Sequence, residues 1–596
     1  MKTRKEIGNV DAALEELGPY GRYSLVQFSL QVVAQIAVVH HMFSIVFTGQ
    51  KNPFQCPVTV SRNISGQGDN GGLNKTGISV SNTNWTASKD VCHSGPHVVN
   101  LDGISWNSSC DAYNVEYQLP KDRYFVSEFD LVCDREYLAA LTQTLLTLGQ
   151  AVASLVCPFF ADNYGRKPTL MLCSFVWLGS SLGLAFSVNY TMFAVFKTLN
   201  GICLQGVFQT TMTVMIETLT SRQRGFMFGC LGAVFGTLSI LLMVPVAYLM
   251  RNYSWRLLEL AYCSYFIYII LNVFFMDESF RWLAANGMHK RAMFVLNRAS
   301  LWNGCNLDKV VSAFYKDDVQ ITFKPISEHY TEMVNVTKIN NKLIDNTTDE
   351  FTINHDDDSN ICKENLDDNF SVEENLNFFS LFRNRQLRFF TAFCTLAWFF
   401  NNLTYFALFL MSSALSGSLY LNYSLNCFVE LPAALFIYFY IDKLGRKICL
   451  ASFNIIAGIS LVGVAITAAI SDQESEVIKV LAIIGKFGVS GSFAVLFTIT
   501  SELFPTNIRN TAQGLASLSA CVGGMLAPFS ELLMSKVVYA PGLIFGTGSL
   551  VLGALTFFLP ETANRQLPQS VKDIENWSHD NEPTKEKRFC HYMCHR

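Results

Sequence analysis

Twelve stretches of apolar residues, each about as long as a bilayer-spanning helix, dominate this sequence. A spanning helix needs ~20 mostly apolar residues, because the hydrocarbon core offers no water to the backbone groups. The stretches lie approximately at 23–47, 138–160, 168–187, 190–215, 226–249, 257–276, 388–411, 417–440, 447–470, 477–501, 510–534 and 540–560. Only 15% of the residues are charged, whereas soluble proteins carry about 25%. The sequence therefore predicts an all-α membrane protein with twelve transmembrane helices, six on each side of a long polar stretch.

A charged motif occurs twice between these stretches. The pattern Asp-x-x-Gly-Arg-Lys begins at Asp162 and begins again at Asp442, 280 positions later. A second pattern, a glutamate seven residues before an arginine, follows each copy as Glu217 with Arg224 and as Glu502 with Arg509. Internal repeats of this kind are typical of membrane transporters built from two related bundles. The repeat therefore predicts two six-helix halves, at 23–276 and 388–560.

Basic residues at alternate junctions between the apolar stretches predict the orientation. They are Arg166, Lys167, Arg222, Arg224, Lys443, Arg446, Lys447 and Arg509. Short cytoplasmic loops of membrane proteins carry an excess of Lys and Arg. Residues 1–22 are polar, so the first apolar stretch is expected to remain as an uncleaved anchor. We expect a multi-pass plasma-membrane protein with the N-terminus, 1–22, and the tail, 561–596, in the cytoplasm.

This orientation makes 48–137 a large extracellular loop. The loop contains four acceptor sites for N-linked glycosylation, at Asn63, Asn74, Asn84 and Asn107. It also contains four cysteines, Cys56, Cys92, Cys110 and Cys133. An even number of cysteines in an oxidising compartment favours two disulfides over four free thiols, and leaves the three possible connectivities open.

The polar stretch between the halves, 277–387, is predicted to be a cytoplasmic linker. Its beginning has the pattern of one or two amphipathic surface helices. Its later part, from Asn340 to Asn377, is rich in Asn and Asp and has few apolar residues. Such a segment cannot bury enough surface to offset its conformational entropy, so we expect an acidic, disordered insert.

Several segments give the chain a resemblance to a known family. The doubled Asp-x-x-Gly-Arg-Lys motif resembles that of the major facilitator superfamily. More narrowly, the chain resembles the organic cation, organic anion and carnitine transporters of solute carrier family 22. The segments that carry this likeness are Phe129–Asp134, Asp277–Leu283, Val429–Pro432, Ser501–Arg509 and Leu559–Thr562. The resemblance implies the major facilitator fold and covers nearly all of the chain except the acidic insert.

The resemblance also implies a role for the repeated charged residues as a cytoplasmic gate. They are Asp162, Arg166, Glu217, Arg224, Asp442, Arg446, Glu502 and Arg509. Ion pairs at a partly wet interface are worth roughly 0–1 kcal/mol each, so they can break and re-form as the halves move. The alternative is that these residues only fix the orientation of the chain, through the excess of Lys and Arg in cytoplasmic loops. The acidic members contribute little to that bias.

The gate motifs depart from the family pattern at four positions. Pro158 and Tyr438 stand where the family usually has Gly, and Asn163 stands where a basic residue is common. The fourth departure is Lys197, where Arg is typical. These differences bear on how firmly the gate closes.

Charged residues inside apolar stretches are candidates for the substrate site, because burying a charge in a membrane is costly. Glu430 occupies the position of a cavity acid in the resembling family and could attract a cationic group. The alternative is a structural pair with a polar neighbour. Lys486, close to the start of its helix, is expected to be structural. His40 and His41 in the first helix could titrate near neutral pH or simply pack.

The remaining substrate candidates come from positions matched to the family. They are Gln205, Phe208, Phe235, Trp398, Tyr405 and Cys521. Aromatic rings could hold an organic cation by cation–π contacts of ~0.5–2 kcal/mol, although any of them could instead only pack. Family members that move cations often have Asp where this chain has Cys521, and those that move anions or carnitine often have Arg. The neutral Cys521 therefore predicts a preference for zwitterions, weak cations or neutral lipophilic metabolites.

The sequence contains no Walker loop, zinc motif or Gly-x-Ser-x-Gly elbow, so we expect neither an enzyme nor a bound cofactor or metal. The function predicted is secondary or facilitative transport of small organic ions or zwitterions, organic cation- or carnitine-like, by alternating access. The expected partners are the small organic substrate, the lipid bilayer and a coupling ion that stays open, and nucleic acid is not expected. The alternatives are a sugar carrier of the same superfamily and a receptor-like protein without flux.

Overall fold

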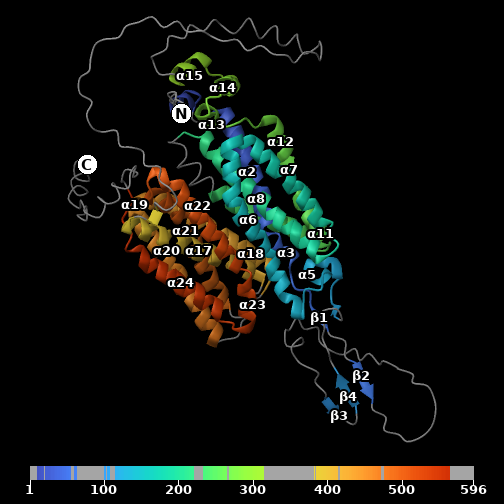
Figure 1. Cartoon of the computed structure of the whole chain (residues 1–596). Coiled ribbons are helices and arrows are strands. Elements are labelled where there is room, and N and C mark those ends of the chain that lie inside the picture. The colour runs from blue at the N-terminus through green and yellow to red at the C-terminus, as the bar shows by residue number, and fades with distance from the viewer. Residues whose placement is uncertain are drawn as a thin grey trace, which may run out of the picture.

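The structure of the chain is a computed structural model (Figure 1). It describes residues 10–18, 21–55, 59–62, 99–101, 104–107, 115–220, 233–264, 267–314, 381–382, 384–413, 417–470 and 476–563. Within these ranges the chain is almost entirely helical, and two bundles follow one another along the sequence.

The first bundle is coloured blue to green in Figure 1 and contains the helices up to residue 275. Its main helices are α2 (Arg22–Phe43), α3 (Ile45–Thr48), α6 (Glu136–Tyr164), α7 (Arg166–Ala185), α8 (Tyr190–Thr218), α10 (Ala233–Leu249), α11 (Trp255–Cys263) and α12 (Ile267–Phe275). Helix α8 packs along both α6 and α7. Close packing is possible at Gly149 and Gly201, where a Cβ atom would meet the backbone of the facing helix.

The second bundle is coloured yellow to red. Its helices are α17 (Arg385–Leu410), α18 (Leu419–Phe428), α19 (Glu430–Leu444), α20 (Arg446–Ile470), α21 (Glu476–Leu503), α22 (Thr506–Leu526), α23 (Phe529–Lys536) and α24 (Ala540–Thr556). Helix α20 packs against α21 and α24, and α17 packs against α22. The interior of this half is apolar and aromatic, with buried residues such as Phe393, Trp398, Phe453 and Leu496.

The helices that could cross a membrane match the predicted apolar stretches. In the described part of the chain, nine helices are long and apolar enough for a span. The pair Thr511–Leu526 and Phe529–Lys536, bent by 41°, corresponds to the stretch 510–534. Two shorter apolar helices, Phe235–Leu249 and Ala540–Thr556, correspond to 226–249 and 540–560. Each of the twelve predicted stretches therefore overlaps a helix among the described residues.

The segment after α3 leaves the bundle and carries short strands. They are β1 (Phe54–Gln55), β2 (Thr59–Arg62), β3 (Val99–Leu101), β4 (Ile104–Asn107) and β5 (Glu116–Tyr117). Antiparallel pairing joins β1 to β5 and arranges the others in the order β2-β4-β3. The segment returns through α5 (Phe125–Glu128), whose Glu128 accepts hydrogen bonds from Arg256 at 2.7 Å and 3.2 Å.

Most of the predicted modification sites in this segment lie outside the described residues. These are Asn63, Asn74, Asn84, Cys56, Cys92 and Cys110, and the side chain of Asn107 is also not described. Cys133, at the start of the short helix η2 (Cys133–Arg135), is disulfide-bonded. The glycosylation sites and the pairing of the other three cysteines stay predictions.

The linker begins with three helices: α13 (Phe280–Ala285), α14 (His289–Asn303) and α15 (Leu307–Phe314). They pack with the N-terminal α1 (Val10–Glu16) around a common apolar core that includes Leu14, Trp282, Leu296 and Phe314. The amide of Asn303 donates to the Leu17 carbonyl at 2.7 Å. The predicted amphipathic helices are thus present, one more than expected, and the acidic insert lies outside the described residues.

The two ends of the bundle differ in how the halves meet. We call the end marked by Thr48 and Glu136, where the 48–137 segment emerges, the loop end. We call the end marked by Gly165 and Gly445 the motif end. At the loop end the halves are joined by aromatic contacts. The ring pairs are Phe43 with Phe406 and Phe409, Phe47 with Tyr420 and Tyr423, and Tyr248 with Tyr420.

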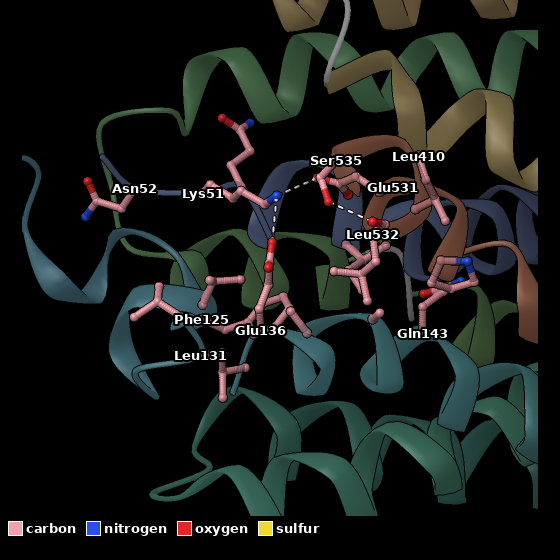
Figure 2. Close-up of a pocket in the computed structure, with 18 of the residues that line it drawn as sticks. Lys51, Asn52, Phe125, Leu131, Glu136, Gln143, Leu410, Glu531, Leu532 and Ser535 are labelled. Carbon is pink, nitrogen blue, oxygen red and sulfur yellow. Dashed lines mark hydrogen bonds and ion pairs between the residues drawn. The ribbon is translucent and has the colours of Figure 1, made fainter. Parts of the chain in front are cut away.

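An ion-pair cluster completes the closure of the loop end. Lys51 of the first half lies 3.0 Å from Glu136 of the same half and 3.2 Å from Glu531 of the second half (Figure 2). Nearby, the hydroxyl of Thr144 in α6 donates to the Met525 carbonyl in α22 at 2.9 Å. The structure is therefore closed at the loop end.

Candidate functional site

The second half contains a buried ion pair. The Nζ atom of Lys486 lies 3.1 Å from Oε1 of Glu430, and the side chains are 0% and 13% exposed. The hydroxyl of Tyr405 donates to the same carboxylate oxygen at 2.8 Å. The ammonium group of Lys486 also lies 3.3 Å from the centroid of the Tyr405 ring and 3.6 Å from that of Phe409. Three helices, α17, α19 and α21, thus bring one acid, one base and two aromatic rings together.

The acid of this cluster lies next to a local irregularity in a helix. The predicted span 417–440 contains α18 and α19, which are separated only by Val429, whose backbone stays helical with φ −63° and ψ −20°, and Glu430 is the first residue of α19. Pro432 lies in the first turn and has no N–H to donate, so the Phe428 carbonyl loses its regular partner.

The lysine of the cluster lies well inside its helix. Helix α21 extends from Glu476 to Leu503, close to the predicted stretch 477–501, and Lys486 lies three turns from its beginning. The expectation that Lys486 lies close to the start of the helix is therefore wrong. Taking two charges out of water is expensive, and a buried pair is weak evidence for stability. Ionisable groups inside membrane spans mark functional sites by default. The pair is therefore the leading candidate for a substrate-contacting group.

The other predicted substrate residues are dispersed around this cluster. Trp398 is buried, donates its indole N–H to Thr500 at 3.0 Å and packs edge-on against Phe493. Phe493 in turn stacks on Tyr405, with ring centroids 5.5 Å apart. Trp398, Phe493 and Tyr405 therefore form a continuous series of ring contacts in the second half, and the role of Trp398 and Tyr405 toward a substrate stays a prediction.

The other predicted substrate residues lie on different helices, with Gln205 and Phe208 on α8, Phe235 on α10 and Cys521 on α22 of the second half. Phe208 and Gln205 lie half-buried in α8, and the Phe208 carbonyl accepts a hydrogen bond from Gln35 at 3.3 Å. Phe235 is 39% exposed on α10. Cys521 is buried in α22, beside the Ala520 carbonyl that accepts from the amide of Asn402. Their role toward a substrate stays a prediction.

A second group of buried charges, in the first half, was missed. Glu259 in α11 is 2% exposed and lies 3.7 Å from His41 and 3.9 Å from Lys197. His41 therefore lies beside an acid that was not among the predicted site residues. The detectable signal was a lone glutamate inside the apolar stretch 257–276. Of this group, only Lys197 and His41 were noted from the sequence.

Buried amides form a polar track that we did not expect. Asn401 donates to Ser492 at 3.0 Å, and Ser492 donates to Asn454 at 3.1 Å. Asn401 and Asn402 are buried next to each other in α17, and buried amides of this kind are the observation that favours the alternative of a sugar carrier.

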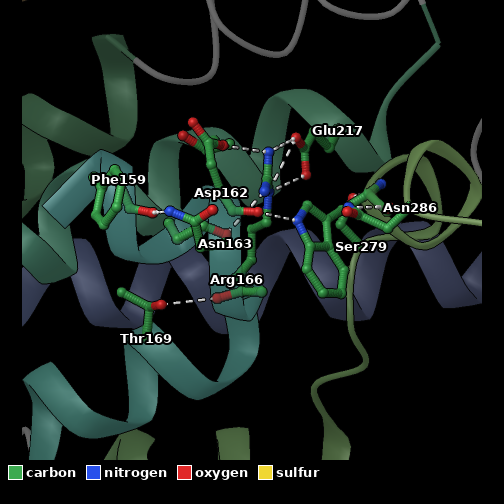
Figure 3. A network of polar contacts seen from close by, with 12 residues as sticks. Phe159, Asp162, Asn163, Arg166, Thr169, Glu217, Ser279 and Asn286 are labelled. Carbon is green, nitrogen blue, oxygen red and sulfur yellow. Dashed lines mark hydrogen bonds and ion pairs between the residues drawn. The ribbon is translucent and has the colours of Figure 1, made fainter. Parts of the chain in front are cut away.

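The repeated motifs at the motif end form matching ion-pair clusters. In the first half, Arg166 lies 2.9 Å from Glu217 and 3.1 Å from Asp162 (Figure 3). Arg166 and Glu217 are 10% and 15% exposed, while Asp162 is 71% exposed. The strong contact is therefore that with Glu217, which the Arg166 guanidinium meets with two nitrogens.

The second half repeats this arrangement. Arg446 lies 2.7 Å from Asp442 and 3.4 Å from Glu502. Each cluster is closed within its own half in this structure. Of the two remaining gate candidates, Arg224 lies outside the described residues, and the side chain of Arg509 is not described.

Two further acids, which lie in segments that carry the family resemblance, cap the helices that follow the motifs. Glu278 accepts hydrogen bonds from the backbone N–H groups of Arg166 and Lys167. Glu561 does the same for Arg446 and Lys447. These N–H groups are the unsatisfied donors at the N-termini of α7 and α20, so the acids satisfy them and complement the helix dipoles.

Glycine is required at the turn that precedes each capped helix. Gly165 has φ +107° and Gly445 has φ +92°, values that other residues rarely adopt. A Cβ atom at either position would also approach the carboxylate of Glu278 or Glu561 too closely. This explains why both copies of the motif contain Gly before Arg.

The fold and the repeated clusters define the class of this protein. The family model described as Major Facilitator Superfamily matches residues 136–528 and 388–581. The chain belongs to the Major Facilitator Superfamily. The predicted major facilitator fold is thereby confirmed.

Within the superfamily, the similarity is to solute carrier family 22. Solute carrier family 22 member 3 of Rattus norvegicus is 29% identical over 451 residues, which cover 76% of this chain and 71% of the relative. Organic anion transporter 3 of Mus musculus is 26% identical over 578 residues, which cover 96% of each chain. These matches confirm the resemblance that the sequence motifs carry.

Solved structures support the fold alone. The inward-open conformation of the xylose transporter XylE from E. coli has a TM-score of 0.53 and 13% identity, covering 92% of this chain and 99% of the other. Its partially occluded inward-open conformation has a TM-score of 0.54 and 10% identity, covering 90% of this chain and 100% of the other.

In the part of the chain that the structure describes, no group of three or more His, Cys, Asp or Glu could hold a metal ion.

Proposed function

We propose that this protein moves small organic ions or zwitterions across a membrane by alternating access, without a cofactor. The observation that carries the proposal is the contact of Glu430 with both Lys486 and Tyr405 inside the second half. An organic cation could exchange with the Lys486 ammonium at the carboxylate and rest on the same aromatic rings. An organic anion could exchange with the carboxylate at Lys486.

The distribution of contacts between the halves supports alternating access. The loop end is held shut by rings and by the Lys51 cluster, all of which join one half to the other. The motif end instead carries clusters that close within each half. These clusters are the gate in our proposal: they hold the ends of the helices rigid and would meet across the halves when the loop end opens.

The substrate class follows from the relatives and from one neutral residue. The relatives include proteins named organic anion transporter 3, so an organic ion is the first expectation. Cys521, which is buried in α22, is uncharged and so offers a substrate neither a positive nor a negative partner. We therefore favour zwitterions and weak cations, with Glu430 and Lys486 supplying one charge of each sign. The coupling ion stays open.

Uptake into cells that express the protein tests this proposal. The panel consists of tetraethylammonium, carnitine, urate, an organic anion and xylose, with pH and sodium varied. Accumulation of an organic ion that is lost in Glu430→Gln supports the proposal. Accumulation of xylose alone would support the sugar carrier, for which the buried Asn401 and Asn402 are the favouring observation. Binding without accumulation of any compound would support a receptor.

We also propose that the protein resides in the plasma membrane with the loop end outside and both termini in the cytoplasm. The basic motif end and the loop sequons support this orientation. Digestion with a glycosidase should raise the gel mobility of the intact protein. Replacing Asn63, Asn74, Asn84 and Asn107 together with Gln should abolish that change. Unaltered mobility of the wild-type protein would refute the orientation.

A further inference from the structure

A cavity separate from the central cluster lies at the loop end. Its volume is about 430 Å³, and none of the predicted substrate residues lines it. Both halves contribute walls: Val46, Phe125 and Leu131 come from the first half, and Leu410 and Leu532 come from the second. The volume is within the range of small-molecule sites, about 300–1,000 Å³, which are mostly apolar with a few placed polar groups.

The polar groups of the cavity converge on one point. Lys51 lies between the carboxylates of Glu136 and Glu531, with contacts of 3.0 Å and 3.2 Å (Figure 2). Burial alone would lower the pKa of Lys51, but the two carboxylates outweigh burial and hold the pKa above its ordinary value. Lys51 belongs to the short connection between α3 and β1, not to a helix. Its side chain is 46% exposed, so it can leave the carboxylates without unfolding a regular element.

The charge balance decides which ligand fits. Lys51, Glu136 and Glu531 together carry one net negative charge. With Lys51 swung into solvent, two carboxylates face an apolar chamber. We propose that this cavity is a second binding site, which takes an organic monocation with an apolar body. Its cationic group occupies the place of the Lys51 ammonium between Glu136 and Glu531, and its apolar body rests on Phe125, Leu410 and their neighbours.

The position of the site gives its ligand a defined effect. The walls come from both halves, so the cavity has this shape only while the loop end is closed. A ligand shifts a conformational equilibrium toward the state to which it binds more tightly. The bound cation therefore holds the loop end closed and slows transport without competing at Glu430.

Calorimetric titration of the purified full-length protein with phenyltrimethylammonium tests the site. Glu531→Gln should weaken binding at least tenfold, and Lys51→Gln should tighten it several-fold, because the internal competitor is gone. Lys121→Gln is the matched control, since Lys121 pairs with Asp130 at 2.8 Å and does not line the cavity. The affinity of the Lys121→Gln variant for phenyltrimethylammonium should equal that of the wild type.

Gain of affinity on removing Lys51 is a result that structural damage cannot produce. The proposal is overturned if Lys51→Gln weakens binding, if Glu531→Gln leaves it unaltered, or if the wild type gives no heat of binding at millimolar probe. It is also overturned if benzenesulfonate, an anion of similar size, binds as tightly. Loss of all binding in Glu430→Gln together with normal binding in Glu531→Gln would place the probe in the central cluster instead.

Discussion

Lys486 and Glu430 form an ion pair of 3.1 Å in which the lysine is fully buried and the glutamate nearly so. The partners lie 56 positions apart in the sequence, on α21 and at the start of α19. Tyr405 joins both, because its hydroxyl donates to the carboxylate and its ring faces the ammonium. Removing two charges from water is unfavourable, so the buried pair has either a functional or a structural role. The two explanations can be separated.

The double variant Glu430→Gln with Lys486→Met separates them. Glu430→Gln alone leaves an unpaired buried ammonium, which should destabilise the protein by roughly 3–5 kcal/mol. The double variant removes both charges, so thermal stability should recover to near the wild-type value. Uptake should not recover, because the substrate contact is still missing. Thermal unfolding in detergent and uptake in vesicles check this, and recovery of both would assign the pair a purely structural role.

The gate clusters predict unequal effects from their two acids. Glu217 is largely buried against Arg166, whereas Asp162 is mostly exposed and worth roughly 0–1 kcal/mol. Glu217→Gln should therefore reduce the uptake rate several-fold, and Asp162→Asn should reduce it less. Equilibrium substrate binding, measured in the same membranes, should change little in either variant. A loss of binding with an unaltered conformational cycle would contradict the gating role.

The turns before the capped helices predict sensitivity to a single methyl group. Gly165→Ala or Gly445→Ala combines positive φ strain with a clash against the capping acid, so each should lower stability by at least ~1–2 kcal/mol. Gly179→Ala in α7 is the control, because a Cβ there meets nothing within 4 Å. Thermal unfolding in detergent is the measurement. Equal midpoints for all three variants would show that the caps do not constrain these turns.

The capping acid Glu278 predicts a pH dependence of stability. Burial raises its pKa above the ordinary 4.5, and the N–H groups of Ser279, Arg166 and Lys167 oppose this only in part. The folded protein then binds this proton more tightly than the unfolded chain, so this contribution to stability is largest at low pH. It declines as pH rises from about 4.5 through the folded pKa. In this pH window the unfolding midpoint should fall less steeply with rising pH in Glu278→Gln than in the wild type. Identical slopes in the two proteins would exclude a contribution of Glu278 to the pH dependence.

Cys521 predicts how charge selectivity could be altered. Cys521→Asp should raise cation uptake relative to anion uptake, and Cys521→Arg should do the reverse. A charge contact of about 1.4 kcal/mol corresponds to a tenfold change in the ratio of cation uptake to anion uptake. Cys521→Ser, which adds no charge, is the control and should leave the ratio unaltered. If Asp and Arg both behave like Ser, Cys521 does not contact the substrate.

The sequence by itself determined the spans and the repeat. Apolar stretches of sufficient length form helices in lipid, because a helix satisfies the hydrogen bonds of all its backbone N–H and C=O groups within one segment. The repeated motifs are local patterns that can be read without knowing the fold, and each half indeed brings Arg166 to Glu217 and Arg446 to Glu502. Glu430 was also detectable, since a charge within an apolar stretch is conspicuous.

Only the tertiary structure decided which of these charges meet. The partnership of Glu430 with Lys486 depends on how α19 and α21 rotate about their axes, and hydropathy does not encode that rotation. Glu259 joined His41 and Lys197 for the same reason. The contacts of Lys51 are still less local: Glu531 lies 480 positions away and in the other half. Such a contact exists only in the conformation that closes the loop end, because it depends on how the two halves are docked and not on either half alone.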